Sequence, residues 1–295
     1  MQVFHYSCFA MGTRFNLVLE TKTEASNEAL SGEVAVMLKE EEARMSCYME
    51  EAELSVINRK AAHSAVKVSD PLARVFDACD YFYQATDGAF DAGLLHLTRT
   101  LKSGDLSLEE AAVMGEVGWK QVDWNPKTRE IKFKGPLAGI DLGGIGKGWA
   151  VEKVRDFLLE KGVEIAFISF GESTVATIGT HPLGDCWPLT IHHPVSQVSM
   201  LIELKDDALS VSGLKEKGDA QTKEGVPHII RAANNTVVEE DQLIVVKAPS
   251  PLTAEVLSTA VMAANEHQRA VIFDNFPDVS IYECVTGEPV FNRLL

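Results

Sequence analysis

Glycines crowd one short segment, Asp141 to Gly148, which reads Asp-Leu-Gly-Gly-Ile-Gly-Lys-Gly and holds four glycines within six positions. Glycine lets the backbone come close to a ligand and adopt positive φ angles. An amphipathic helix pattern follows at once, so the free N–H groups and dipole of that helix can face a phosphate, to which Lys147 adds a positive charge. The segment therefore predicts contact with a phosphate, although a turn that needs glycine only for packing explains the same residues.

The spacing in this loop excludes two familiar phosphate-binding motifs. The Walker A pattern, G-x-x-x-x-G-K-[ST], does not fit the positions of the glycines around Lys147, and neither does G-x-G-x-x-G. The phosphate prediction therefore depends on glycine content, on the lysine and on the helix that follows.

A second pattern lies near the C-terminal end, in the segment Thr253 to Ala260. Glu255 and Thr259 are four residues apart, so on a helix they share one face. A carboxylate and a hydroxyl are hard oxygen ligands of the kind that Mg²⁺ prefers. The same pair is also typical of an ordinary solvated helix face, so by itself it does not identify a metal site.

Several other polar or flexible positions are ambiguous when taken singly. Met11 precedes a glycine near an expected strand turn, and Ser212 precedes another glycine. His228 is isolated, and a lone histidine is more typical of a structural position than of catalysis. Asp87 and Asp91 flank Gly-Ala-Phe and could equally cap helices.

The hydrophobic pattern changes repeatedly between helix and strand periods, without an internal repeat, which predicts an α+β fold. Ser69-Asp70-Pro71 is a strong helix start, because a capping side chain precedes proline in the first turn. We expect helices at 25–47, 69–85, 106–114, from the central loop to 161, and at 253–265, and a turn or short helix at 55–58. Strands are expected within 4–20 (as two strands, or as one with a turn at Gly12), as a hairpin within 121–134, and at 165–170, 174–178, 189–192, 200–204, 209–212, 243–247, 271–273 and 281–285, with an exposed loop at 215–226.

Composition narrows the classes of function. The chain has 295 residues, 46% of them hydrophobic, and a formal net charge of −16. So acidic a protein is a poor candidate for binding nucleic acid, and an anionic ligand would need local help from N–H groups, a lysine or a metal ion. No apolar run approaches the roughly 20 residues of a membrane helix. No signal peptide is visible, so we expect a cytoplasmic protein, or a periplasmic or membrane-attached one if a leader has been trimmed.

In their order along the chain, these segments resemble the ApbE family of FAD:protein FMN transferases. The most specific matches are the loop Asp141–Gly148 and the piece Thr86-Asp-Gly-Ala-Phe-Asp91, and the resemblance extends from Met11 to about Ala260. It implies one flavin-binding α+β domain over 1–295, or two tightly packed subdomains, with mixed sheets and helices around a central FAD cleft. It also implies a Mg²⁺-dependent reaction that cleaves FAD and joins FMN through a phosphodiester to a Thr or Ser of an acceptor flavoprotein.

The resemblance also assigns expected roles to individual residues. It places Met11, Asn58, Asp91 and Ser212 along the FAD site, the backbone of Gly143, Gly144 and Gly146 with Lys147 near the pyrophosphate, and His228 beside the dinucleotide. A carbonyl near Gly144 would ligate the metal together with Glu255 and Thr259. The expected catalytic residues are Asp141, Lys147 and His228, with either Asp141 or Glu255 as the base that activates the acceptor hydroxyl.

Two positions depart from the family pattern. The family has Asp where this chain has Glu255, which is longer by one methylene. The family also continues His-Ile-Ile with Asp-Pro-x-Thr-Gly, where this chain has Arg231-Ala-Ala-Asn-Asn235. Both departures fall at the expected reaction centre. They keep three alternatives open: a protein that binds FAD without turnover, a FAD pyrophosphatase, and an interaction protein that has lost the ligand.

Overall fold

The computed structural model describes residues 2–104, 107, 110, 116–193, 196, 198–213, 229–239 and 242–295. The expected loop at 215–226 and His228 lie outside these residues, as does the expected helix at 106–114 apart from Ser107 and Glu110. Within the described part of the chain, no helix combines the length and the apolar character that crossing a bilayer requires.

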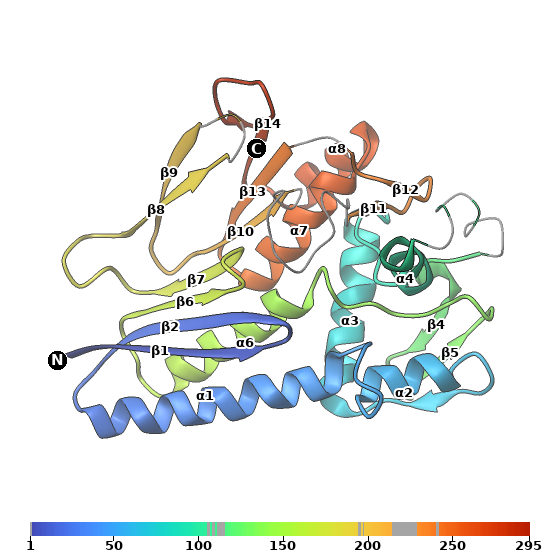
Figure 1. The fold of residues 1–295 in the computed structure, drawn as a ribbon, viewed down its shortest axis with the longest axis horizontal. Helices are drawn as coiled ribbons and strands as arrows, with labels where there is room; N and C mark the ends of the chain where they lie inside the picture. The colour runs from blue at the N-terminus through green and yellow to red at the C-terminus, as the bar shows by residue number, and fades with distance from the viewer. Residues whose placement is uncertain are drawn as a thin grey trace.

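An antiparallel sheet of eight strands fills the left side of the molecule in Figure 1. In β2, Phe15, Leu17 and Leu19 are fully buried and alternate with more exposed residues, as expected for a strand whose one face packs on the core. The order in space is β1 (Gln2–Ala10), β2 (Thr13–Thr21), β6 (Ala166–Phe170), β7 (Thr174–Ile178), β10 (Ala208–Gly213), β13 (Gln242–Ala248), β14 (Ser280–Val285) and β15 (Asn292–Arg293).

The first two strands form a hairpin with a two-residue turn at Met11 and Gly12, so the two-strand alternative of the prediction is the correct one. Both turn residues have positive φ, 49° and 76°, as a type I′ hairpin turn requires. The N–H of Met11 donates to Glu42 Oε1 at 2.9 Å, which ties the tip of the hairpin to helix α1 (Glu24–Met45).

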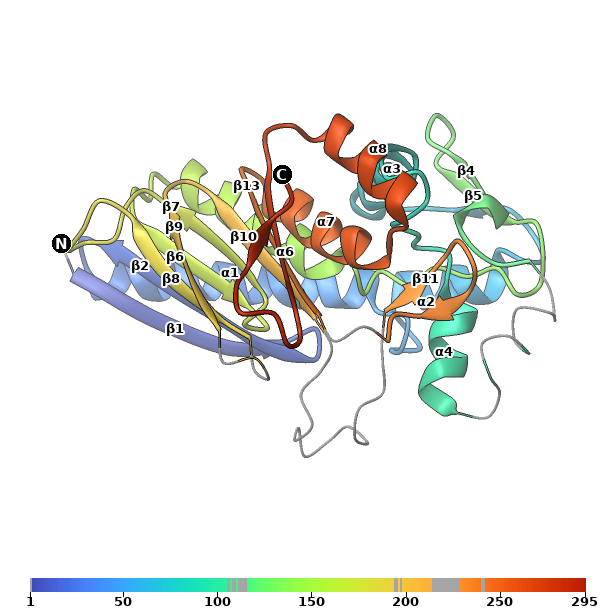
Figure 2. The same cartoon turned by 90° about the horizontal axis from the view of Figure 1, so that it is seen from above.

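Three helices cover one face of this sheet. They are α1, α6 (Gly146–Glu160) and α7 (Pro251–Ala263), and Figures 1 and 2 show them packed side by side along the strands. The other face carries a two-stranded ribbon, β8 (Trp187–His192) and β9 (Ser199–Leu204), which buries Trp187 and Ile202 against Val175, Leu209 and Val245. The two faces of the sheet therefore contribute side chains to two different hydrophobic cores.

The right side of Figure 1 is built from helices and a small sheet. Helix α3 begins at Asp70 with proline in its first turn and ends at Ala85, which confirms the expected bounds. The expected capping bond is wrong, because the Ser69 hydroxyl donates to Glu53 Oε2 at 2.6 Å and makes no bond to the first turn. The other elements are α2 (Glu53–Lys60), α4 (Leu95–Ser103), the 3₁₀ turn η1 (Trp119–Gln121), the small sheet of β3 (Val66–Lys67), β5 (Glu130–Phe133) and β4 (Val122–Asn125), and the pair β11 (Ile230–Arg231) and β12 (Thr236–Val237).

The strand expected at 271–273 was wrong, because these residues lie inside helix α8 (Glu266–Asn275). Asn265 and Gln268 form a complete capping box: each side chain accepts the other's backbone N–H, at 2.9 and 3.1 Å. That box starts a helix immediately before the apolar run. An apolar run of three residues cannot by itself distinguish a strand from a buried helix turn.

Candidate functional site

Hydrogen bonds to the backbone hold the central loop in place. Asn58 on α2 donates to the Ile140 carbonyl at 2.9 Å and accepts the Ile140 N–H at 2.8 Å. Ile140 is fully buried, so these bonds satisfy polar groups that water cannot reach. Asp141 accepts the Gly143 N–H at 2.9 Å, and its own N–H donates to Ala92. The turn into α6 is therefore fixed from two sides.

The beginning of α6 already uses some of the N–H groups that a phosphate would need. Ile145 and Gly146 both donate to the Leu142 carbonyl, at 3.1 and 2.8 Å, while the Gly143 N–H is engaged by Asp141. An engaged donor contributes less to an anion. The N–H groups of Gly143, Ile145 and Gly146 therefore have partners within the loop.

Packing requires at least one glycine of the loop. A methyl group on Gly148 would lie 2.6 Å from Glu255 Cβ and 2.7 Å from the Pro251 carbonyl oxygen, so only glycine lets α6 approach α7 this closely. Gly146 is overlaid by Met11, whose Cε would lie 3.1 Å from such a methyl group. Met11 at the hairpin tip is therefore next to the central loop, and the packing explanation holds for Gly148.

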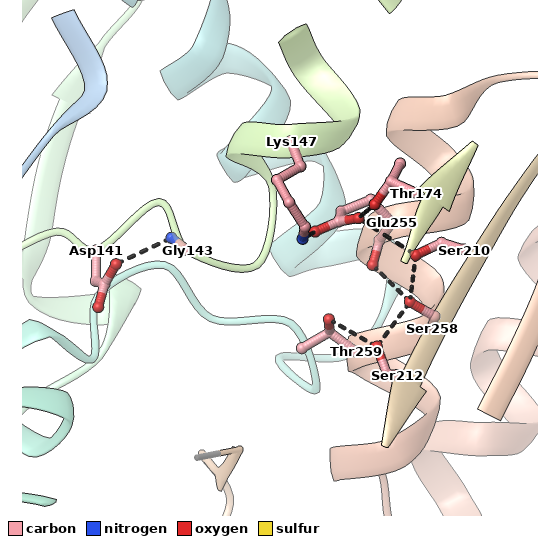
Figure 3. A network of polar contacts seen from close by, with 9 residues as sticks. All are labelled: Asp141, Gly143, Lys147, Thr174, Ser210, Ser212, Glu255, Ser258 and Thr259. Atoms are coloured by element: carbon pink, nitrogen blue, oxygen red, sulfur yellow. Dashed lines mark hydrogen bonds and ion pairs between the residues drawn. The ribbon is translucent and has the colours of Figure 1, made fainter. Parts of the chain in front are cut away.

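Lys147 and Glu255 form an ion pair at the point where α6, α7 and the sheet meet (Figure 3). Glu255 is only 3% exposed. Its Oε1 accepts from Lys147, while its Oε2 accepts from Thr174 and, at 3.2 Å, from Ser210. Both oxygens of this buried carboxylate are thus bonded to other side chains.

A row of hydroxyl groups continues from this carboxylate along α7 and β10, as Figure 3 shows. Ser210 and Ser258 lie 3.1 Å apart, Ser258 and Ser212 2.8 Å, and Ser212 and Thr259 3.4 Å between their hydroxyl oxygens. Thr259 reaches the central loop, since a methyl group on Gly144 would lie 3.9 Å from Thr259 Oγ1. The row therefore links Glu255 to the loop through hydroxyl oxygens.

The chemistry of these donors suits a hard cation only in part. In the described residues no group of three or more His, Cys, Asp or Glu side chains could hold a metal ion. Glu255 supplies a carboxylate one helix turn from Thr259, and Lys147 already pairs with it. Mg²⁺ commonly binds through one or two carboxylates completed by substrate phosphates and water. The residues therefore fit Mg²⁺ as a site that a phosphate-bearing ligand completes.

A pocket of about 660 Å³ lies between the end of α3, η1, the β11–β12 turn and the start of α8. Its volume is in the range of small-molecule sites. Three acids, Asp87, Asp91 and Glu116, line it together with one lysine, Lys120. This excess of negative charge disfavours a phosphate and favours groups that donate hydrogen bonds, such as the amino groups of aromatic bases, ring N–H groups and hydroxyls.

Asp91 is the most deeply held acid of the pocket. Its Oδ1 accepts the Gly93 N–H at 2.6 Å and the Trp119 N–H at 2.8 Å. A methyl group on Gly118, whose φ is +97°, would lie 2.7 Å from Oδ2, so the chain passes close beneath the carboxylate. Burial raises the pKa of Asp91 to about 6, against the lowering effect of the two N–H donors.

We expect Asp91→Asn to flatten the dependence of stability on pH. The pKa of Asp91 in the folded chain, about 6, exceeds its ordinary 3.8, so the folded chain holds this proton more tightly. The stability that this group contributes is therefore lost as pH rises from about 4 to about 6, and it changes little at higher pH. Urea unfolding at four pH values should show the variant losing about 2 kcal/mol less than wild type across this window. Equal losses would contradict the assignment.

The segment that departs from the family pattern forms part of the same pocket. Ala232, Ala233 and Asn235 line it, in the turn between β11 and β12. Asn235 takes a positive φ of 57°, a conformation in which asparagine is common. The departure thus lines the pocket with two small apolar side chains, where larger side chains would reduce its volume.

The structure brings together some of the expected residues and separates others. Lys147, Glu255, Ser212, Thr259 and Gly144 lie along one continuous row of contacts. By contrast, Asp91 lines the pocket, and Asn58 holds the loop from below rather than presenting a free amide. Their roles toward FAD, and that of His228, stay predictions.

Three residues of the network were not expected from the sequence: Thr174, Ser210 and Ser258. Ser210 and Ser212 are two apart on strand β10, so they point to the same face, and that alternation was a signal that could have identified Ser210. Thr174 and Ser258 have no comparable signal. Their part in the site follows from the way distant strands and α7 pack.

Fold and site together define a class of α+β protein that joins a glycine-rich loop, a lysine, a buried carboxylate and a row of hydroxyls in one network, and that also has a polar pocket. More particularly, the chain belongs to the ApbE family, whose family model matches residues 11–282. The match spans the hairpin tip, the central loop and α7, and confirms the resemblance.

Individual relatives agree with this membership. The FAD:protein FMN transferase of Vibrio cholerae is 27% identical over 283 residues, which cover 90% of this chain and 82% of that protein. The crystal structure of the ApbE protein from Thermotoga maritima has a TM-score of 0.85 at 23% identity and covers 99% of this chain and 97% of its own. The flavin transferase ApbE from Vibrio cholerae has a TM-score of 0.83 at 24% identity, with coverages of 99% and 96%. These likenesses confirm the predicted α+β fold.

Proposed function

We propose that this chain is a FAD:protein FMN transferase. The hydroxyl oxygen of a Thr or Ser on an acceptor flavoprotein attacks the FMN phosphorus of FAD. A new P–O bond forms, the P–O bond to the bridging oxygen breaks, and AMP leaves with that oxygen. The observation that carries the proposal is the meeting of Lys147, Glu255 and Thr259 at the central loop of a chain whose curated relatives bear this name.

Lys147 and the loop provide the site for the pyrophosphate in this proposal. The ammonium offers a full charge at the start of α6, where it offsets the charge that develops on the leaving phosphate. Met11 lies over Gly146 and limits the access of water from the hairpin side. Asn58 keeps Ile140 and the following turn in register, so its role is to position the loop.

Asp141 is the better candidate for the base. The acceptor hydroxyl must lose a proton as it attacks, and a carboxylate with an unengaged oxygen can take it. Both oxygens of Glu255 are bonded to Lys147, Thr174 and Ser210. In the described residues Asp141 accepts only the Gly143 N–H, on Oδ1, which leaves Oδ2 available. We infer that Asp141 activates the hydroxyl.

The remaining ligands follow from chemistry and position. Glu255, Thr259 and a carbonyl near Gly144 would hold Mg²⁺, which supplies neutralisation of phosphate charge when bound. The acidic pocket around Asp91 would hold a neutral, donor-rich part of the dinucleotide. His228 would lie beside the dinucleotide, as the family resemblance implies.

Two observations favour a second candidate, a protein that binds FAD without transferring FMN. Glu255 is already paired with Lys147, and the β11–β12 turn lines the pocket with Ala232 and Ala233. A FAD pyrophosphatase of the same fold is the enzymatic form of this alternative.

One assay separates these functions. The protein is incubated with FAD and Mg²⁺, with and without an acceptor flavoprotein, and AMP and free FMN are measured by chromatography. The proposal expects AMP mainly when the acceptor is present and no matching free FMN. Equal AMP and FMN without acceptor would identify a pyrophosphatase, while FAD binding without AMP would identify a binding protein. Either result would overturn the proposed transfer.

A further inference from the structure

The ion pair with Lys147 engages Glu255, the carboxylate assigned to the proposed metal site. The side chain of Glu255 is 4% exposed and that of Lys147 is 25% exposed, so the pair is shielded from water on the carboxylate side. Charges interact more strongly in such a setting than on an open surface. An ammonium in contact with Oε1 therefore competes with any divalent cation for the same oxygen.

The same ammonium is also the charge that a phosphate would draw toward itself. Lys147 leaves from the first turn of α6, beside the glycines of the central loop, and its aliphatic stem lies near Gly171. A lysine chain has several rotatable bonds and a compact charge, so it can exchange one anionic partner for another without moving the backbone. A pyrophosphate at the loop gives the ammonium that second partner.

We propose that Glu255 is shared between two cations: Lys147 holds it in the ligand-free protein, and a divalent cation binds it once a phosphate has drawn the ammonium away. This inference rests on the proposed function in taking a pyrophosphate dinucleotide as the ligand. By linkage, the factor by which FAD tightens metal binding equals the factor by which the metal tightens FAD binding.

Thr174 and Ser210 keep the carboxylate in place during this exchange. Both hydroxyls donate to Oε2, while the ammonium contacts Oε1. Thr174 is fully buried and Ser210 is 1% exposed, so neither hydroxyl is free to rotate into water. The exchange of partners is thereby confined to one oxygen, and Thr174 and Ser210 act as positioning residues.

Isothermal titration of metal-free protein with MgCl₂, with and without saturating FAD, tests this exchange. Wild type should bind Mg²⁺ at least tenfold more tightly with FAD. Lys147→Met should bind Mg²⁺ alone at least tenfold more tightly than wild type does, because the carboxylate has lost its competitor. The matched control is Lys153→Met on the same helix, which removes the partner of another buried glutamate, Glu41, and should titrate like wild type.

The exchange would be overturned if the Mg²⁺ affinity of Lys147→Met were within twofold of the wild-type affinity. It would also be overturned if FAD still tightened Mg²⁺ binding by Glu255→Gln. Circular dichroism checks that each variant is folded. If Lys147→Met does not fold, Lys147→Gln replaces it, and it too should bind Mg²⁺ alone at least tenfold more tightly than wild type. The titrations involve no turnover. If FAD and Mg²⁺ tighten each other's binding but no AMP forms, this inference stands and the proposed function is wrong. If FMN is transferred without that coupling, the proposed function stands and this inference is wrong.

Discussion

Glu255→Gln is expected to lower kcat for FMN transfer by about a thousandfold, a loss typical of removing a group that organises charge in a transition state. The amide has nearly the same volume and can still accept from Thr174 and Ser210, so the protein should stay folded. It carries no charge, however, and therefore loses its attraction for both Lys147 and a divalent cation. Steady-state kinetics with FAD and an acceptor flavoprotein measure the effect.

Glu41→Gln is the matched control for that change. Glu41 is also buried, at 1% exposure, and accepts from Arg44 at 2.7 Å, Lys153 at 2.5 Å and Trp149 at 3.2 Å. It joins α1 to α6 through partners that Glu255 does not share. The variant should therefore lose about 2–3 kcal/mol of stability but keep the wild-type kcat at temperatures where it is folded. If both variants retain wild-type kcat, the role assigned to Glu255 is wrong.

Gly148→Val is expected to cost about 4 kcal/mol of stability or to prevent soluble folding. A Cβ at this position would lie 2.6 Å from Glu255 Cβ, 2.7 Å from the Pro251 oxygen and 3.0 Å from Leu252 Cα. Two of these three atoms belong to the backbone of α7 and cannot rotate away. The two helices must therefore separate, which opens the core between them. Urea unfolding and the yield of soluble protein measure the loss.

Gly32→Ala provides the opposite control for Gly148. It is also a helix glycine, in α1, but a Cβ there meets nothing within 4 Å. Alanine has the higher helix propensity, so this variant should gain about 0.5–1 kcal/mol. A Gly148→Val protein that unfolds at the wild-type urea concentration would show that α6 and α7 do not pack as closely as described.

Much of the fold could be predicted because local signals agree with the tertiary structure. Ser69-Asp70-Pro71 starts α3, and the alternation in β2 matches its burial. The strand predicted at 271–273 failed because a capping box at Asn265 and Gln268 outweighs a three-residue apolar run. The weights of competing local signals are difficult to judge without knowing what each element packs against.

Some residues of the candidate site could be predicted from the sequence, but the contacts between them could not. The glycine-rich loop stands out by residue type and spacing, whereas Glu255 and Thr259 were assigned to the site by the family resemblance. The ion pair between Lys147 and Glu255 joins residues 108 positions apart, and no local pattern reveals it. The same applies to Thr174, which reaches Glu255 because β7 lies beside α7. Long-range pairing of this kind depends on the packing of complete elements.

The most direct measurement of the central claim is mass spectrometry of an acceptor flavoprotein after incubation with this protein, FAD and Mg²⁺. The proposed function predicts one FMN joined through a phosphodiester to a single Thr or Ser, an equal amount of AMP, and modification about a thousandfold slower with Glu255→Gln. An acceptor that stays unmodified with wild-type protein while FAD is bound or hydrolysed would contradict it.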